Sequence, residues 1–106
     1  DLTSRNWMPT WDFVEVDRYS YSQKLQKRFF PVLTGRGCTG RCAFCSPTNG
    51  RYRGRPVEHV LAELEYLISH YDFDYFYFIN EVFFQTEEQI IAFCRGYSRL
   101  KGRKPW

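Results

Sequence analysis

Three cysteines form the part of this sequence most suited to chemistry. Cys38, Cys42 and Cys45 follow a C-x3-C-x2-C pattern, and Gly40 between the first two lets the backbone curl so that several sulfurs can point at one centre. Three thiolates with no fourth nearby suit an iron–sulfur cluster that has one iron left open. The spacing therefore predicts a cluster at whose open iron another molecule could react.

Other interpretations of the cysteines fit the spacing less well. A structural zinc site usually has two Cys pairs, or a Cys pair with a His pair, whereas His59 and His70 lie far apart in one expected helix. Disulfides are also disfavoured, because three thiols this close cannot pair without strain and one would remain odd. Cys94 lies on an apolar helical stripe, so we expect it to be buried and not to be a fourth ligand.

Length and composition restrict the class of protein. A chain of 106 residues is one small domain at most, yet 20% of its residues are aromatic, so we expect it to be a fragment of a larger core. The net charge of +3 comes without a long basic run, so no nucleic-acid partner is expected. No apolar stretch is long enough to span a membrane, and no signal peptide is visible. Reduced thiols indicate the cytoplasm.

The first strand should lead directly into the cysteines. Residues 1–27 are polar and broken by Pro9, which predicts an irregular linker or N-terminal extension, and residues 28–106 form the partial core domain. The apolar run over residues 28–34 predicts a strand in which Pro31 is tolerated at a sheet edge. The cysteines then follow the carboxyl end of this strand, the side at which parallel α/β folds bind ligands.

The remaining pattern predicts a helix, a strand and a second helix. A helical apolar stripe begins just after Pro56, with Glu58, Glu63 and Glu65 expected to face elsewhere. Residues 73–79 are nearly apolar on both faces, as in a parallel strand covered on both sides. Thr86 and Gln89 form a capping box before the second helix. Right-handed crossovers would make the sheet parallel, with a third strand opening at Trp106.

Cys38, Cys42 and Cys45, with the aromatic Phe44 before the last cysteine, resemble the signature of the radical S-adenosylmethionine (SAM) enzymes. In that family the three thiolates hold a [4Fe–4S] cluster, and the fourth iron binds the amino and carboxylate groups of SAM. Reduction of the cluster then cleaves SAM to a 5′-deoxyadenosyl radical. The resemblance implies an α/β fold, namely the first β/α units of a partial TIM-type barrel whose remainder lies outside this chain. It also implies a reductant such as flavodoxin or ferredoxin.

The resemblance implies further cofactor-binding residues. Glu81 follows the second strand, where the family's rim segment binds the amino group of SAM, and Asn80 is a weaker candidate beside it. Phe44 would stack on adenine, and Arg53 would contact the SAM carboxylate. Simpler roles stay open. Glu81 could lie in water or pair with Arg53 or Arg55, Phe44 could only cover the cluster, and the arginines could form a solvated loop.

The segment from Trp7 to Phe13 is similar to the linker before the barrel in the cobalamin-dependent branch, which includes methyltransferases and anaerobic tetrapyrrole-ring cyclases. Ile79-Asn80, where many members have two glycines, is similar to the same branch. Cobalamin would then be bound by a domain outside this chain. Two alternatives remain, a methylthiotransferase with a second cluster upstream and a non-catalytic iron–sulfur or zinc module that uses Cys94. The sequence does not choose the substrate.

Overall fold

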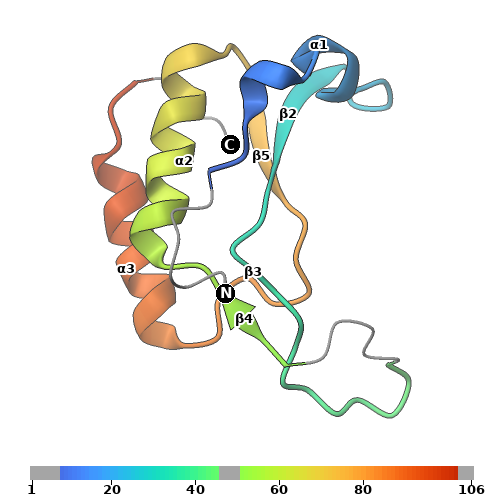
Figure 1. Ribbon diagram of the computed structural model, residues 1–106, viewed down its shortest axis with the longest axis vertical. Coiled ribbons are helices and arrows are strands. Elements are labelled where there is room, and N and C mark those ends of the chain that lie inside the picture. Colours follow the sequence, from blue (N-terminus) through green and yellow to red (C-terminus); the bar gives the residue numbers. More distant parts are fainter. Residues whose placement is uncertain (1–7, 46–50, 103–106) are drawn as a thin grey trace.

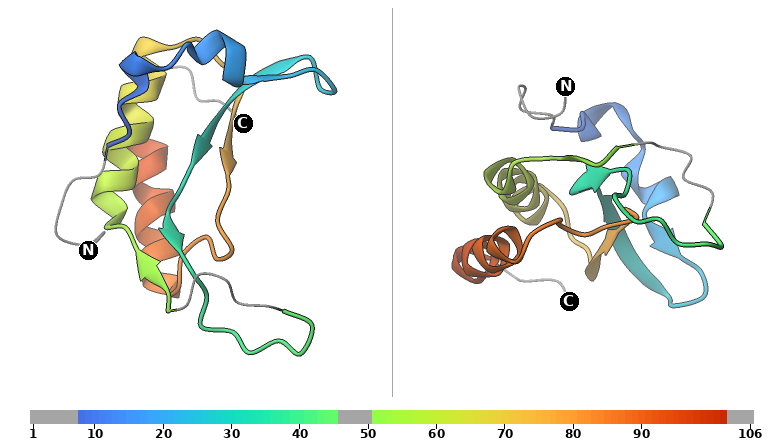
Figure 2. Two further views of the ribbon diagram at one scale, coloured as in Figure 1. Left: turned by 45° about the vertical axis from the view of Figure 1, so that its right-hand side comes forward. Right: turned by 90° about the horizontal axis from the view of Figure 1, so that it is seen from below.

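The computed structural model describes residues 8–45 and 51–102 of the 106-residue chain. Its elements, in chain order, are η1 (Trp11–Phe13), α1 (Val16–Tyr19), β1 (Tyr21–Ser22), β2 (Lys27–Val32), β3 (Gly35–Arg36), β4 (Arg53–Gly54), α2 (Val57–His70), β5 (Tyr75–Phe78) and α3 (Glu87–Arg99). The two long helices lie next to each other on one side of the β2–β5 pair (Figure 1; Figure 2). This arrangement is the helix-on-sheet layering expected of an α/β protein.

The central strand pair is parallel, as the sequence predicts. β2 and β5 run in the same direction, with Phe29 opposite Tyr75 and Val32 opposite Phe78, and α2 makes the crossover between them. β1 adds to the other edge of β2 in the antiparallel direction, while β3 and β4 form a separate two-stranded sheet. No closed barrel is formed by the residues described here, so the TIM-type barrel stays a prediction.

Helix α2 forms because its apolar residues recur at helical spacing. Val60, Leu64 and Leu67 are fully buried and pack on Phe30 and Val32 of β2 in one core. Pro56 lies immediately before the helix, where its fixed φ fits and its missing N–H costs nothing. The predicted helix is therefore confirmed, and its buried stripe fixes the position of α2 over the carboxyl half of β2.

Helix α3 begins at the predicted capping box. The Thr86 side chain accepts a hydrogen bond from the Gln89 backbone N–H, and the Gln89 side chain accepts one from the Thr86 backbone N–H. Phe93 is buried in the core, but Cys94 is exposed, so the prediction of a buried Cys94 is wrong. Successive residues of a helix point about 100° apart, which carries Cys94 away from the core that Phe93 reaches.

Pro31 lies where a strand tolerates proline. Arg28 and Val32 accept hydrogen bonds from Asp74 and Ile79, so alternate residues of β2 face β5 and the Pro31 nitrogen faces the opposite edge. The pairing with β1 reaches only Lys27 and Arg28, before Pro31. β2 is the middle strand in the order β1-β2-β5, so Pro31 is not on an edge strand, but it lies beyond the residues of β2 that pair with β1.

Strand β5 is covered on one face among the described residues, whereas its sequence predicts cover on both. Phe76 and Phe78 pack toward the core and α3, but Tyr77 is 55% and Ile79 is 47% exposed. The sequence does not indicate which face of β5 is exposed, because the residues on both faces are aromatic or aliphatic.

The N-terminal segment is more ordered than the predicted linker, since it contains η1, α1 and the short strand β1. Trp11 meets Phe30 edge-on, with ring centroids 5.1 Å apart, and Asp12 accepts hydrogen bonds from the hydroxyls of Tyr66 and Tyr71. These contacts hold the segment against β2 and α2. Trp7 of the proposed linker motif and the expected strand at Trp106 lie outside the described residues. Across residues 8–45 and 51–102, no helix has the length and apolar character needed to cross a membrane.

Candidate functional site

The cysteine loop stands on a short two-stranded stem beyond the carboxyl end of β2. It leaves through β3 and returns through β4, which pair antiparallel with Gly35 opposite Gly54 and Arg36 opposite Arg53 (Figure 1). Gly37 follows the stem with φ 83°, in the left-handed region that favours glycine, and this turns the chain into the loop. The stem thus places the cysteines beyond the end of the parallel strand pair.

Two of the sulfurs flank Gly40. A Cβ atom at Gly40 would lie 3.2 Å from Cys38 Sγ and 3.8 Å from Cys42 Sγ, and the Gly40 backbone N–H donates a hydrogen bond to Cys38 Sγ at 3.2 Å. The Cys45 backbone N–H donates to the Cys42 carbonyl at 3.0 Å, which closes a turn between the last two cysteines. A Cβ at Gly40 would therefore make a tight contact with Cys38 Sγ and an ordinary van der Waals contact with Cys42 Sγ.

The thiols are chemically available. Cys38 is half-buried, Cys42 and Cys45 are exposed, and all three are free cysteines. In the part of the chain that the structure describes, no three His, Cys, Asp or Glu side chains are close enough together to hold a metal ion. The donor set nevertheless fits an iron–sulfur cluster, because it consists of thiols with a backbone N–H directed at one sulfur.

The segment after β5 is hydrogen-bonded to the end of β2. Asn80 Oδ1 accepts from the Thr34 backbone N–H at 3.3 Å, and Asn80 Nδ2 donates to the Val82 carbonyl at 2.5 Å. The fully buried Thr34 also donates its hydroxyl to the Phe83 carbonyl. Both the oxygen and the nitrogen of the Asn80 amide therefore have partners within the protein, and Asn80 links the segment after β5 to the end of β2. Its role as a SAM ligand stays a prediction.

The other predicted cofactor residues lie near the same end of the sheet. Glu81 follows Asn80 directly and is exposed, Arg53 is exposed on β4, and Phe44 is 95% exposed within the loop. A long hydrogen bond of 3.5 Å from Gln85 Nε2 to Thr39 Oγ1 joins the segment after β5 to the cysteine loop. The structure brings the two segments together, and the contacts of these three side chains with SAM stay predictions.

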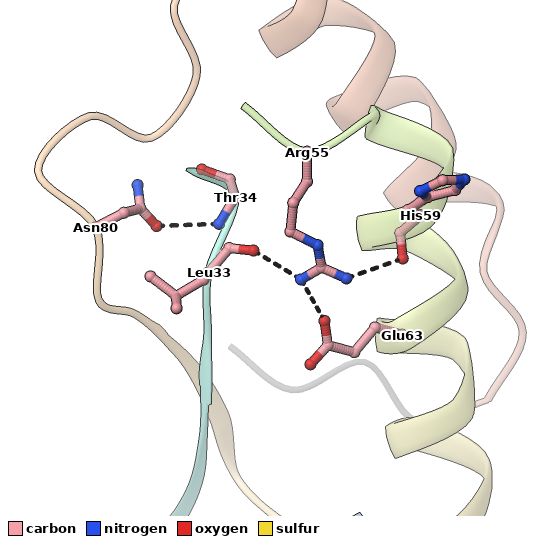
Figure 3. Close-up of polar contacts among 6 residues, drawn as sticks. All are labelled: Leu33, Thr34, Arg55, His59, Glu63 and Asn80. Carbon is pink, nitrogen blue, oxygen red and sulfur yellow. Dashed lines mark hydrogen bonds and ion pairs between the residues drawn. The ribbon is translucent and has the colours of Figure 1, made fainter. Parts of the chain in front are cut away.

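A buried ion pair that was not predicted from the sequence lies at the base of the loop. Arg55 Nη1 lies 2.6 Å from Glu63 Oε2, and the two side chains are 6% and 1% exposed. The same Nη1 donates to the Leu33 carbonyl at 2.8 Å, while Nη2 donates to the His59 carbonyl at 3.5 Å (Figure 3). The Arg55 backbone N–H donates to the Thr34 carbonyl at 2.8 Å. Arg55 thus joins the returning end of the loop to its outgoing end.

Two expectations are corrected by this pair. Glu63 does not face away from the helical stripe, because it lies three residues after Val60 and four before Leu67, within the stripe itself. Arg55 is not part of a solvated basic loop, because its side chain is buried and pairs with Glu63. An acidic residue inside an apolar stripe, with an arginine just before the helix, was the available sequence signal.

Burial sets the electrostatics of Glu63. Loss of water raises the pKa of its carboxyl above the ordinary value, and the hydrogen bond and charge of Arg55 act in the opposite direction, with a smaller contribution from the Trp11 indole. Glu63 Oε1 has no hydrogen-bond partner of normal geometry among the described residues. It borders a pocket of about 450 Å³ that Trp11, Leu33 and Gly35 also line.

The chain is similar to two curated enzymes over most of its length. An uncharacterized methyltransferase of Pyrococcus horikoshii is 31% identical over 87 residues, which make up 79% of this chain and 18% of the relative. An anaerobic magnesium-protoporphyrin IX monomethyl ester cyclase of Rubrivivax gelatinosus is 31% identical over 88 residues, or 81% of this chain and 16% of the relative. The chain therefore spans less than a fifth of the length of either relative. No protein-family model and no solved structure matches it.

Proposed function

We propose that this chain is the first part of the catalytic core of a radical SAM enzyme of the cobalamin-dependent branch. The single observation that carries the proposal is the cysteine loop, in which the sulfurs of Cys38 and Cys42 flank Gly40 beyond the end of a parallel strand pair. The names of the two relatives support the branch, because methyltransferases and anaerobic tetrapyrrole-ring cyclases are the enzymes that the sequence resemblance implies. The reaction would accordingly be methyl transfer or ring cyclisation.

Each proposed ligand has a physical role. The thiolates of Cys38, Cys42 and Cys45 would hold three irons, and the Gly40 N–H would stabilise the negative sulfur of Cys38. When bound, the [4Fe–4S] cluster would pass one electron from an external reductant to SAM, which would be cleaved to methionine and a 5′-deoxyadenosyl radical. Glu81 would accept hydrogen bonds from the SAM amino group in a charge-assisted pair.

Two loop residues would orient the rest of the cofactor. The exposed ring of Phe44 would stack on the adenine, and the Arg53 guanidinium would fork onto the SAM carboxylate. Both side chains are exposed, Phe44 in the loop and Arg53 on β4 of its stem. Cobalamin would be supplied by a domain outside this chain.

The charge around the loop suits an acidic electron donor in the cytoplasm, such as flavodoxin or ferredoxin. The sequence has no Asp or Glu between Asp17 and Glu58, while the stretch around the cysteines contains Arg36, Arg41, Arg51 and Arg53. These four arginines are exposed. A basic surface of this kind would steer an acidic reductant toward the cluster and fix its orientation.

The proposal is tested by SAM cleavage in the intact protein. After anaerobic reconstitution with iron and sulfide, reduction in the presence of SAM should release 5′-deoxyadenosine and methionine. Cys42→Ala should abolish both iron binding and cleavage, whereas Cys94→Ala should retain them. Loss of metal in Cys94→Ala would favour the non-catalytic module instead. A second cluster bound by cysteines elsewhere in the intact protein would favour a methylthiotransferase.

A further inference from the structure

We propose that the buried Arg55–Glu63 pair is a positioning device for the cysteine loop, through which Glu63 influences cofactor binding without touching the cofactor. The role rests on the proposed function, because the loop is the part of the chain that would hold the cluster. The effect of the pair on amide exchange in the loop can nevertheless be measured in the metal-free protein.

Arg55 joins the two ends of the loop at its base. Its guanidinium donates to the carbonyl of Leu33, just before the loop leaves the sheet, and its backbone N–H donates to the carbonyl of Thr34. The stem between these ends is short, since it pairs only Gly35 with Gly54 and Arg36 with Arg53. The Arg55 contacts therefore extend the closure of the stem toward the sheet, where the backbone is already fixed by β2.

Glu63 fixes the guanidinium from the helix. An arginine side chain has many rotamers, and the contact of 2.6 Å with a carboxylate that is 1% exposed selects one of them. Glu63 lies between the buried Val60 and Leu64 on α2, so its own position is set by the packing of the helix on the sheet. The loop is thereby anchored to α2 as well as being held by its stem.

The same connection reaches the segment that contains Glu81. The Thr34 carbonyl accepts from the Arg55 backbone N–H, and the Thr34 hydroxyl donates to the Phe83 carbonyl. The Thr34 backbone N–H donates to the Asn80 side chain (Figure 3). Hydrogen bonds thus run from Glu63 through Arg55 and Thr34 to the segment after β5. The cysteines and Glu81 would then keep fixed positions relative to each other, which is required when two segments bind one ligand.

The chemistry of the pair favours positioning over stability. A buried ion pair is weak evidence for stability, because apolar side chains of similar volume often fill the same space as well or better. The guanidinium holds its N–H donors in a fixed plane, and its Nη1 binds the Leu33 carbonyl and the Glu63 carboxylate together. An apolar replacement would keep the packing and lose both directed contacts.

The test uses the double variant Arg55→Met/Glu63→Leu in the intact protein. We expect it to stay folded, because the side-chain volume is nearly retained and no charge is left unpaired, while the Leu33 carbonyl loses its side-chain donor. Hydrogen–deuterium exchange of the amides in residues 35–45 of the metal-free protein should nevertheless rise about tenfold. In the reconstituted protein the dissociation constant of SAM should rise about tenfold or more, because small misplacements of reacting groups are costly. The matched control is Arg18→Met/Glu15→Leu, which removes an exposed pair on and before α1 and should change neither readout.

Wild-type exchange in the loop of a stably folded double variant would overturn the proposal, as would faster exchange with an unchanged affinity for SAM. If the double variant does not fold, the single variant Arg55→Lys tests the proposal instead. Lysine keeps the charge beside Glu63 but lacks the planar fork, so loop exchange should rise in a folded protein, and unchanged exchange would again contradict the proposal. A wild-type protein that binds a cluster but not SAM would instead refute the proposed function, and the exchange result would still report on the loop.

Discussion

The side-chain oxygen of Asn80 accepts a hydrogen bond from the backbone N–H of Thr34 at 3.3 Å, which joins the segment after β5 to the end of β2. The relationship matters because Thr34 is fully buried, so its N–H has no access to water. Asn80 was expected from the sequence to contact a cofactor, and the structure gives it two internal partners. Asn80 thus joins the segment that contains Glu81 to the end of β2.

Asn80→Ala should loosen this connection locally. A buried N–H left without an acceptor costs about 1–3 kcal/mol, so the local opening free energy of the Thr34 amide should fall by a similar amount. Hydrogen exchange of the intact protein measures it. Asn80→Asp is the comparison, because it keeps an acceptor for Thr34 but replaces the donor to the Val82 carbonyl with a second oxygen. Unchanged protection of Thr34 in Asn80→Ala would contradict the hydrogen bond.

Gly40→Val should impair binding of the cluster. The added Cβ would lie 3.2 Å from Cys38 Sγ and 3.8 Å from Cys42 Sγ, so the methyl groups of valine would crowd the sulfurs at a cost of about 1–3 kcal/mol. The affinity for iron should therefore fall about tenfold or more, measured as iron and sulfide bound per protein after reconstitution. Ala43→Val adds bulk at an exposed position of the same loop and serves as the control. Equal iron binding by both variants would show that the space beside Gly40 is not part of the site.

Asp12→Asn should lower the pKa of Tyr66. The Tyr66 hydroxyl donates to Asp12 at 2.9 Å, and this bond, more than burial or the carboxylate charge, raises the pKa of Tyr66 from 10.0 to about 12. Ultraviolet titration of wild type and variant, each compared with Tyr66→Phe, should show the pKa returning toward 10.0 in Asp12→Asn. An identical titration of Tyr66 in both proteins would rule out this contact.

The raised pKa of Tyr66 also makes the stability of the folded protein depend on pH. The folded state holds the tyrosine proton more tightly than the unfolded state, so the contribution of the Tyr66–Asp12 bond is fully present below pH 10.0 and is lost as the pH rises to about 12. The attachment of the N-terminal segment to α2 should weaken over that window. Exchange of amides in η1 should therefore accelerate there more in the wild type than in Asp12→Asn.

Local patterns predicted the helices and the order of the elements well. The stripe of Val60, Leu64 and Leu67 and the Thr86–Gln89 capping box depend on residues a few positions apart, and both are present in the structure. The parallel pairing of β2 with β5 followed from the handedness of the crossover. These features are visible in sequence because neighbouring residues determine them.

Features that depend on distant contacts were missed. The pairing of Gly35 with Gly54 has no alternating pattern that would announce a stem, and β1 is too short to show one. Glu63 was assigned to the outer face of its helix by its charge, although its spacing places it among buried residues, where Arg55 makes its burial possible. Spacing thus predicted the helices, whereas the hydrogen bonds that join the segment after β5 to the end of β2 were not predicted.

The central claim is that Cys38, Cys42 and Cys45 hold a cluster whose open iron binds SAM. The most direct measurement is the electron paramagnetic resonance spectrum of the intact protein, reconstituted anaerobically and reduced, before and after SAM is added. The account predicts a reduced [4Fe–4S] signal that changes on addition of SAM and is absent in Cys42→Ala. A spectrum that SAM leaves unchanged, in a protein with its full content of iron and sulfide, would contradict it.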